Sequence, residues 1–156
     1  MDPSFFLREA IKLAHEKMLA RCGGPFGAVI VRHGTIIGRG WNQVTSTHDP
    51  TAHAEIVAIR EACQHLGSFQ LNDCTIFTNC EPCPMCLSAI YWARIPTVHY
   101  AATRHDAAAI GFADEFLYQE ICRPSEARSV RMVQSRREEA LVSFSAWESL
   151  EGKIPY

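Results

Sequence analysis

Apolar residues recur at helical spacing at the start of the chain. The N-terminal stripe consists of Phe6, Ala10, Leu13 and Ala14. This spacing predicts an amphipathic helix over residues 4–21. The small and cyclic residues of the segment 22–25, two glycines and a proline among them, are typical of a chain break and end the helix.

Three further helices are predicted downstream. One begins near His53 and ends at Gly67, with a buried stripe of Ile56, Ile59, Cys63 and Leu66. The next, over 84–94, is apolar nearly all round, as expected of a helix packed between a sheet and a partner; one side carries Cys86, Ile90 and Ala93. A short helix is expected over 114–121.

The β-rich runs alternate with these helices. Residues 26–31 and 35–41 flank His33-Gly34 and predict a hairpin. Shorter strands are expected at 75–78 and 97–101, and the polar stretch 43–50 is expected to be a loop. Alternation of strands and helices predicts an α/β fold of three layers, α/β/α, around a central sheet.

The last part of the chain shows a weaker pattern. Residues 130–133 are expected to form an edge strand, and residues 138–150 a final helix that buries Ala140, Phe144 and Trp147. The charge run 136–139 is interpreted as a solvated helix start.

Composition narrows the function classes. A chain of 156 residues with 47% apolar residues fits one domain, residues 1–156, with a real core. The net charge of −2 and a pI near 6.4 provide no strong positive field, which makes nucleic acid an unlikely partner. No segment has the length and apolarity of a membrane span, so no membrane partner is expected. Because no signal peptide is recognised and seven cysteines are present, we expect a cytoplasmic location with cysteines as ligands or core residues.

Two short segments carry metal chemistry. Cys83 and Cys86 are three residues apart, so one helical turn places both sulfurs on the same face, and the helix N-terminus favours thiolates. With His53 they form a donor set that suits Zn²⁺. Three protein ligands leave the fourth tetrahedral position open, which is typical of a catalytic zinc. Cys80 is a rival ligand, although Pro82 disfavours a helical turn between it and Cys83.

A carboxylate stands two residues after the histidine. At a helix start, the side chains of His53 and Glu55 can both lean across the helix end, so Glu55 can stay off the metal and within reach of its water. The alternative is an ordinary acidic residue stabilised by the helix dipole. The combination of His-x-Glu with Pro-Cys-x-x-Cys is the signature of zinc-dependent base deaminases.

The chain resembles the zinc-dependent cytidine deaminase superfamily over nearly its whole length. Segments 25–31, 40–42 and 48–56 look like the first strand, the substrate strand and the first metal segment of that family. The resemblance implies a cytidine-deaminase-like fold with a central mixed sheet and one Zn²⁺ per subunit, held by His53, Cys83 and Cys86, with Glu55 as the proton carrier.

Two branches of the family share these motifs, the bacterial guanine deaminases and the tRNA adenosine deaminases. Segments 23–27, 81–94, 106–108 and 111–114 and the terminal tyrosine are similar to the guanine branch. The tRNA branch is expected to carry a basic C-terminal helix, whereas the last thirty or so residues here mix both signs of charge. The resemblance therefore implies hydrolytic deamination of guanine to xanthine and ammonia in purine catabolism.

The resemblance also implies substrate-binding roles for residues outside the metal segments. Phe26 would stack on the purine, Asn42 and the backbone of Ala54 would hydrogen-bond it, and Asp114 would bind the base and help to move protons. The implied homodimer would exchange a C-terminal segment, about residues 130–156, so that the pocket is closed by residues of the neighbour, Trp92 and Tyr156. From sequence alone each has a plainer reading, such as a core aromatic for Phe26 or an N-cap for Asp114.

Other functions remain open at this point. A tRNA adenosine deaminase, or a deaminase of guanosine, cytosine or ammeline, would use the same metal segments. A binding module with a purely structural zinc would need a fourth protein ligand, for which Cys80 or Cys74 is the candidate.

Overall fold

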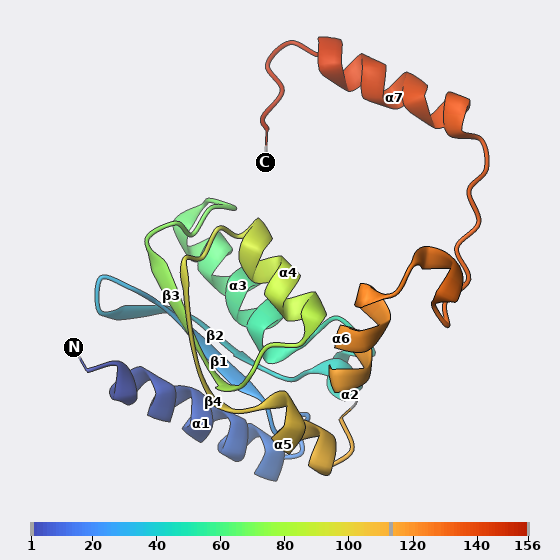
Figure 1. Cartoon of the computed structure of the whole chain (residues 1–156). Coiled ribbons are helices and arrows are strands. Elements are labelled where there is room, and N and C mark those ends of the chain that lie inside the picture. The colour runs from blue at the N-terminus through green and yellow to red at the C-terminus, as the bar shows by residue number, and fades with distance from the viewer. Residues whose placement is uncertain (1, 113, 156) are drawn as a thin grey trace. The chain divides into compact units, whose positions relative to one another are not determined.

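A four-stranded mixed sheet lies between helix α1 (Pro3–Leu19) on one face and helices α3 (Ala54–Leu66) and α4 (Pro84–Trp92) on the other (Figure 1). The computed structural model describes residues 2–112 and 114–155. Alternate residues of one strand serve both faces: Val29 and Val31 pack against α1, and Ala28 and Ile30 belong to the core under α3 and α4. This arrangement confirms the predicted three-layer α/β/α fold with a mixed sheet.

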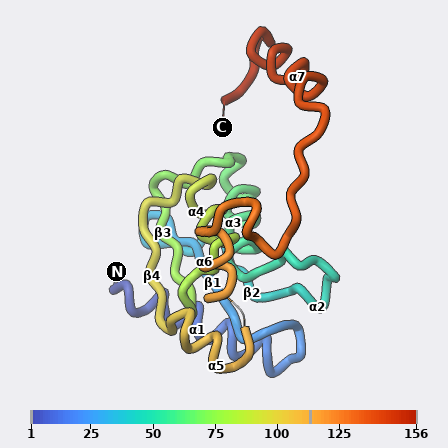
Figure 2. Tube along the Cα trace, turned by 45° about the vertical axis from the view of Figure 1, so that its right-hand side comes forward, coloured from blue at the N-terminus to red at the C-terminus, as the bar shows by residue number. Residues whose placement is uncertain are grey.

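The strand order is β2-β1-β3-β4, so β2 and β4 are the edges (Figure 2). Strands β1 (Gly27–Arg32) and β2 (Thr35–Trp41) form the predicted antiparallel hairpin, and both turn residues, His33 and Gly34, have positive φ. Strand β3 (Cys74–Cys80) pairs antiparallel with β1 and parallel with β4 (Thr97–Ala102). Helix α4 makes the crossover that the parallel pair requires.

Helix α3 packs on the sheet through small residues. Its fully buried positions are Ala54, Glu55, Ala58 and Ala62, whereas the predicted stripe of Ile56, Ile59, Cys63 and Leu66 is half-buried; the last three of these pack against the same core. The cause lies in β2, where a Cβ on Gly40 would stand 2.0 Å from the Ala54 carbonyl oxygen and one on Gly38 2.4 Å from that of Ala58. The backbones approach so closely that only alanine fits at the interface.

The segments around the core differ from the predicted outline in two places. Residues Val44–Thr47, expected to be a loop, form a one-turn helix, α2, because Thr47 and Ser46 bond back to the Gln43 carbonyl. Helix α5 (Arg104–Ala109) was not predicted, although its capping box of Thr103 and Asp106 is a recognisable start signal. Helix α6 (Asp114–Cys122) confirms the short helix expected there.

The chain divides into two compact units, one ending at Tyr118 and the other beginning at Gln119. The second unit contains the 3₁₀ turn Ser125–Ala127 and helix α7 (Arg137–Ser149). The predicted strand over 130–133 is wrong, since that stretch is a bend followed by irregular chain and belongs to none of the described strands.

Helix α7 lies nearly where the sequence predicts it, but the side chains expected to be buried are not. Ala140, Phe144 and Trp147, expected to be buried, are exposed, Phe144 by 69%. The sequence pattern identifies an apolar face, and this unit supplies no second element to cover it.

Among the described residues, no helix has the length and apolarity to cross a bilayer.

Candidate active site

Two helices begin at the same point above the sheet, and the residues that begin them are the predicted ligands. His53 is the N-cap of α3 and Cys83 the N-cap of α4; both have extended backbones, and neither side chain caps its own helix. Pro84 occupies the first position of α4, where a missing N–H costs nothing. Cys86 follows in the first turn, so it faces the same way as Cys83. The side chain of His53 on α3 and those of Cys83 and Cys86 on α4 are therefore free to turn toward one another.

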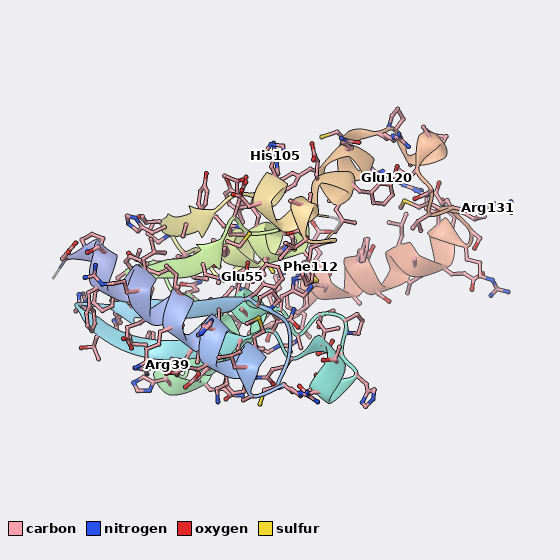
Figure 3. The ribbon with its side chains drawn as sticks, turned by 90° about the horizontal axis from the view of Figure 1, so that it is seen from below. Arg39, Glu55, His105, Phe112, Glu120 and Arg131 are labelled. Atoms are coloured by element: carbon pink, nitrogen blue, oxygen red, sulfur yellow. The ribbon has the colours of Figure 1, made fainter. Side chains whose placement is uncertain are left out.

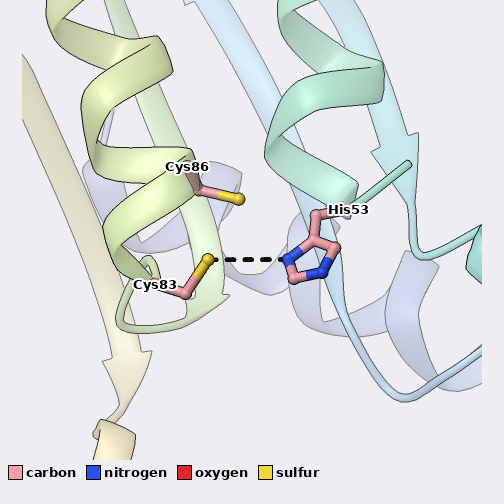
Figure 4. A group of neighbouring side chains, drawn as sticks. All are labelled: His53, Cys83 and Cys86. Atoms are coloured by element: carbon pink, nitrogen blue, oxygen red, sulfur yellow. Dashed lines mark hydrogen bonds between the residues drawn. The ribbon is translucent and has the colours of Figure 1, made fainter. Parts of the chain in front are cut away.

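His53, Cys83 and Cys86 come together as the sequence predicts (Figure 4). Their ligand atoms lie within 4.8 Å of one another, and His53 Nδ1 is 3.7 Å from Cys83 Sγ. Zinc bonds of about 2.0 Å to nitrogen and about 2.3 Å to sulfur at a tetrahedral angle place those two atoms about 3.5 Å apart. Two thiols and an imidazole at this spacing fit Zn²⁺.

Cys80 does not join this cluster. Its thiol lies 3.6 Å from the Thr103 carbonyl oxygen, and burial raises its pKa to about 11. Cys74, at the opposite end of β3, contacts Asp73 instead. Within the described part of the chain, the candidate metal group thus has three protein ligands, which leaves room for a fourth ligand from outside the protein.

The two thiols of the cluster have pKa values shifted in opposite directions. The Cys86 thiol, assisted by His53, lowers the pKa of the Cys83 thiol to about 4 despite burial. The same hydrogen bond, with burial, raises the pKa of Cys86. The hydrogen bond to Cys83 raises the pKa of His53. A thiolate is therefore already favoured at Cys83, and a divalent cation would favour one at Cys86 as well.

Glu55 is a buried carboxyl at the start of α3. It is 6% exposed, and removal from water raises its pKa to about 7. At that pKa a carboxyl can both accept and release a proton near neutrality. The structure brings Glu55 to the same cavity as His53 and Cys83, as the sequence predicts.

The cavity has a volume of about 270 Å³ and lies over the two helix starts. Glu55 and Phe112, labelled in Figure 3, both line it. Three of the predicted substrate-binding residues also line it: Phe26, Asn42 and Asp114. Burial raises the pKa of Asp114, which begins α6. Residues far apart in the sequence thus supply an aromatic wall, an amide and two carboxyls around one space.

Asn42 presents a fixed amide to this cavity. It is 7% exposed, and its Oδ1 accepts from the backbone N–H groups of Val44, at 3.3 Å, and Gly24, at 3.5 Å. Within the described residues its Nδ2 has no acceptor. Because an amide that accepts on one side donates on the other, Asn42 can donate a hydrogen bond to a ligand.

Phe112 is a cavity residue that the sequence reasoning missed. Its ring packs edge-on against Phe26, with centroids 4.7 Å apart and planes at 86°. No periodicity marks it, since it stands between helices α5 and α6. The only signal is its place in the segment 111–114, which resembles the guanine branch of the family.

Two other predicted substrate residues, Ala54 and Trp92, are not among the described residues that line this cavity. Ala54 is buried in the first turn of α3 beneath the cluster. Trp92 lies at the far end of α4 and is 67% exposed. Tyr156, predicted to close the pocket, lies outside the described residues.

Comparison with known proteins agrees with this geometry. The model of the cytidine and deoxycytidylate deaminase zinc-binding region matches residues 2–102. A guanine deaminase of Bacillus subtilis (strain 168) is 53% identical over 156 residues, the full length of both chains. A tRNA-specific adenosine deaminase of Streptococcus pyogenes serotype M18 is 45% identical over 118 residues, 76% of this chain and 71% of its own. Among solved structures, the X-ray structure of a guanine deaminase from Bacillus subtilis has a TM-score of 0.97 at 52% identity and covers 100% of this chain and 99% of its own.

The ligand set gives a direct prediction. Cys83→Ala removes a thiolate from the cluster, so we expect bound zinc to fall from about one per chain to well below that level. Metal analysis of the purified protein measures this. Cys80→Ala is the matched control, a buried cysteine on the neighbouring strand, and should retain its zinc. Full zinc in the Cys83 variant together with loss in the Cys80 variant would reverse the assignment.

Proposed function

The chain belongs to the cytidine and deoxycytidylate deaminase family, and we propose that it is a zinc-dependent guanine deaminase that converts guanine and water to xanthine and ammonia. The observation that carries the choice of guanine is the full-length similarity to the guanine deaminase of Bacillus subtilis. The cavity supports the choice, because Phe26, Asn42 and Asp114 stand together beside the metal cluster. We assign the whole chain, 1–156, to one functional deaminase domain.

The residues divide the chemistry between them. His53, Cys83 and Cys86 would hold one Zn²⁺ per subunit, and the metal when bound supplies a water whose pKa is lowered to about 7. Glu55 would accept a proton from the attacking water as the water oxygen bonds to C2 of guanine. It would then deliver this proton to ring nitrogen N3.

Completion of the reaction requires the amino group to leave as ammonia. Glu55, aided by Asp114, would take the proton of the C2 hydroxyl and pass it to that amino group; the C2–N bond breaks, ammonia leaves and a carbonyl remains at C2. The raised pKa values of both carboxyls, caused by burial, suit groups that hold and pass on a proton. The low exposure of Glu55 also limits proton exchange with bulk water during the step.

Substrate contacts follow from the walls of the cavity. We assign Phe26 to stacking against the purine plane and Nδ2 of Asn42 to donation to an acceptor on the base. The backbone of Ala54 would make a further hydrogen bond. Guanine offers carbonyl and ring-nitrogen acceptors as well as amino and N–H donors, so a donor amide and an acidic side chain match both kinds of group.

The nearest rival is deamination of adenosine in tRNA. The tRNA-specific relatives match only 76% of this chain, whereas the guanine deaminase of Bacillus subtilis matches all of it. A net charge of −2 also gives little attraction for an RNA backbone. A structural zinc module is disfavoured because the described metal group has three protein ligands and opens onto a cavity.

We further propose a homodimer in which the C-terminal segment, residues 130–156, crosses to the neighbouring subunit. Tyr156 of this segment, together with Trp92 of the same chain, would then contribute to the neighbour's pocket. The exposed apolar side chains support a partner: in α7 they are Val142, Phe144 and Trp147, and in α4 Tyr91 and Trp92. A second copy would cover surface that the single chain leaves in water. All seven cysteines are free thiols, which supports action in the cytoplasm. The proposed reaction would place the protein in purine catabolism.

The proton carrier can be tested with an ammonia-release assay. Wild-type protein should release ammonia from guanine in preference to guanosine, adenine, cytosine and ammeline. Glu55→Gln should keep its zinc and lose about 10²- to 10⁴-fold in kcat, because it removes the only group assigned to move the water's proton. Glu61→Gln on the exposed side of the same helix is the control. Guanine turnover by the Glu55 variant at the wild-type rate would reject the mechanism, and guanine alone being inert would reject the substrate.

The exchanged tail can be tested by complementation. Deletion of residues 155–156 should lower kcat/KM for guanine about 10- to 100-fold, with fold and zinc content retained, because one wall of the pocket is lost. Mixing this truncated chain with the Glu55→Gln chain, after dissociation and reassembly, should restore part of the activity. In such a dimer an intact Glu55 receives an intact tail from its neighbour. No restoration, in a mixture shown to form mixed dimers, would place the tail on its own subunit's site.

A further inference from the structure

We propose that Asn79 is a positioning residue of the pocket: its side-chain amide holds the backbone on both sides of Phe26 and thereby sets where the Phe26 ring stands. Asn79 touches neither the cavity nor the metal cluster, so it would act only through Phe26. The inference rests on the proposed function, in which the Phe26 ring stacks against the base.

The geometry of the amide carries the proposal. The Oδ1 atom of Asn79 accepts from the Gly27 N–H at 2.9 Å, and its Nδ2 donates to the Pro25 carbonyl at 2.9 Å. These two partners are the residues immediately before and after Phe26. Because the amide is planar and both of its ends are engaged, it fixes the spacing and orientation of the two peptide groups that flank Phe26.

The amide works where the pairing of β1 with β3 stops. The pairing of β1 with β3 ends at Ala28 opposite Thr78, one residue before Gly27 and Asn79 would meet. Pro25 has no N–H, so it could not serve as a donor in a continued ladder. The Asn79 side chain replaces the missing backbone bonds, and β1 is held there by an amide that a single substitution can remove.

Other contacts hold the same backbone from other sides. The Phe26 carbonyl accepts from the Asn42 N–H at 3.0 Å, which comes from the β2 side. Gly27 presses against α1, since a Cβ on it would stand 2.5 Å from the Ala10 carbonyl oxygen. Asn79 supplies the restraint from β3, the strand that leads into Cys83. It thus ties the aromatic wall to the segment that carries the metal ligands.

The experiment is a double-mutant cycle in the full-length protein. Asn79→Ala should lower kcat/KM for guanine about 10- to 100-fold, the order of loss caused by a displacement near 1 Å at a reacting site. The loss should come mainly from a higher KM, with zinc content unchanged. Asn72→Ala is the matched control, because Asn72 is an exposed asparagine at the other end of the same strand region.

The cycle separates positioning from general stability. Phe26→Leu removes the ring, so adding Asn79→Ala to it should cost less than threefold further in kcat/KM. Equal losses of kcat/KM with and without the Phe26 ring, or no loss in the single variant, would overturn the proposal. If Asn79→Ala does not fold, Asn79→Asp, which keeps the acceptor for Gly27 and loses the donor to Pro25, takes its place in the cycle.

A crystal structure of the Asn79 variant tests the same idea without any assay. The Phe26 ring should leave its edge-on contact with Phe112, where the centroids are 4.7 Å apart in the parent chain. An unmoved ring would reject the positioning role even if activity falls. If wild-type protein proves inactive on guanine, the proposed function fails, and this structural outcome still decides the role of Asn79.

Discussion

The close approach of helix α3 to strand β2 is the constraint on which the site depends. Glycines at positions 38 and 40 let the helix backbone lie against the strand, with alanines at the contact. This close approach fixes where α3 begins over the end of the sheet, and therefore where His53 and Glu55 lie. Helix α4 reaches the same point from the crossover between parallel strands β3 and β4. The three candidate ligands meet because α3, which packs on β2, and α4, which links β3 to β4, both begin at one place.

Much of this could be predicted from the sequence, for identifiable reasons. The hairpin at His33-Gly34 and the helix start at Cys83-Pro84 are local signals that depend on turn and cap chemistry. The stripe of α3 was misassigned because hydrophobic residues were expected at the contact, whereas the approach of the backbones leaves room only for alanine. Whether a side chain is buried depends on what faces it, and that partner is distant in sequence.

The site shows the same division. His53, Cys83 and Cys86 carry a spacing that metal chemistry imposes, so the sequence alone identified them. Phe112 lies in irregular chain, where its ring packs on Phe26 and its N–H donates to the Ala107 carbonyl, so no periodicity marks it. The exposed face of α7 marks the other limit: the sequence pattern identifies this apolar face, yet no other described element of its unit covers it.

The two helices of the site begin with residues that do not satisfy them. An N-cap normally accepts a hydrogen bond from the first turn, and a serine, aspartate or asparagine there contributes about 1 kcal/mol. His53 and Cys83 make no such bond, because their side chains turn toward each other. The metal-free chain therefore carries two helix starts without side-chain caps. Selection for the stability of that metal-free chain alone would favour serine or aspartate at these two positions and would remove the metal centre.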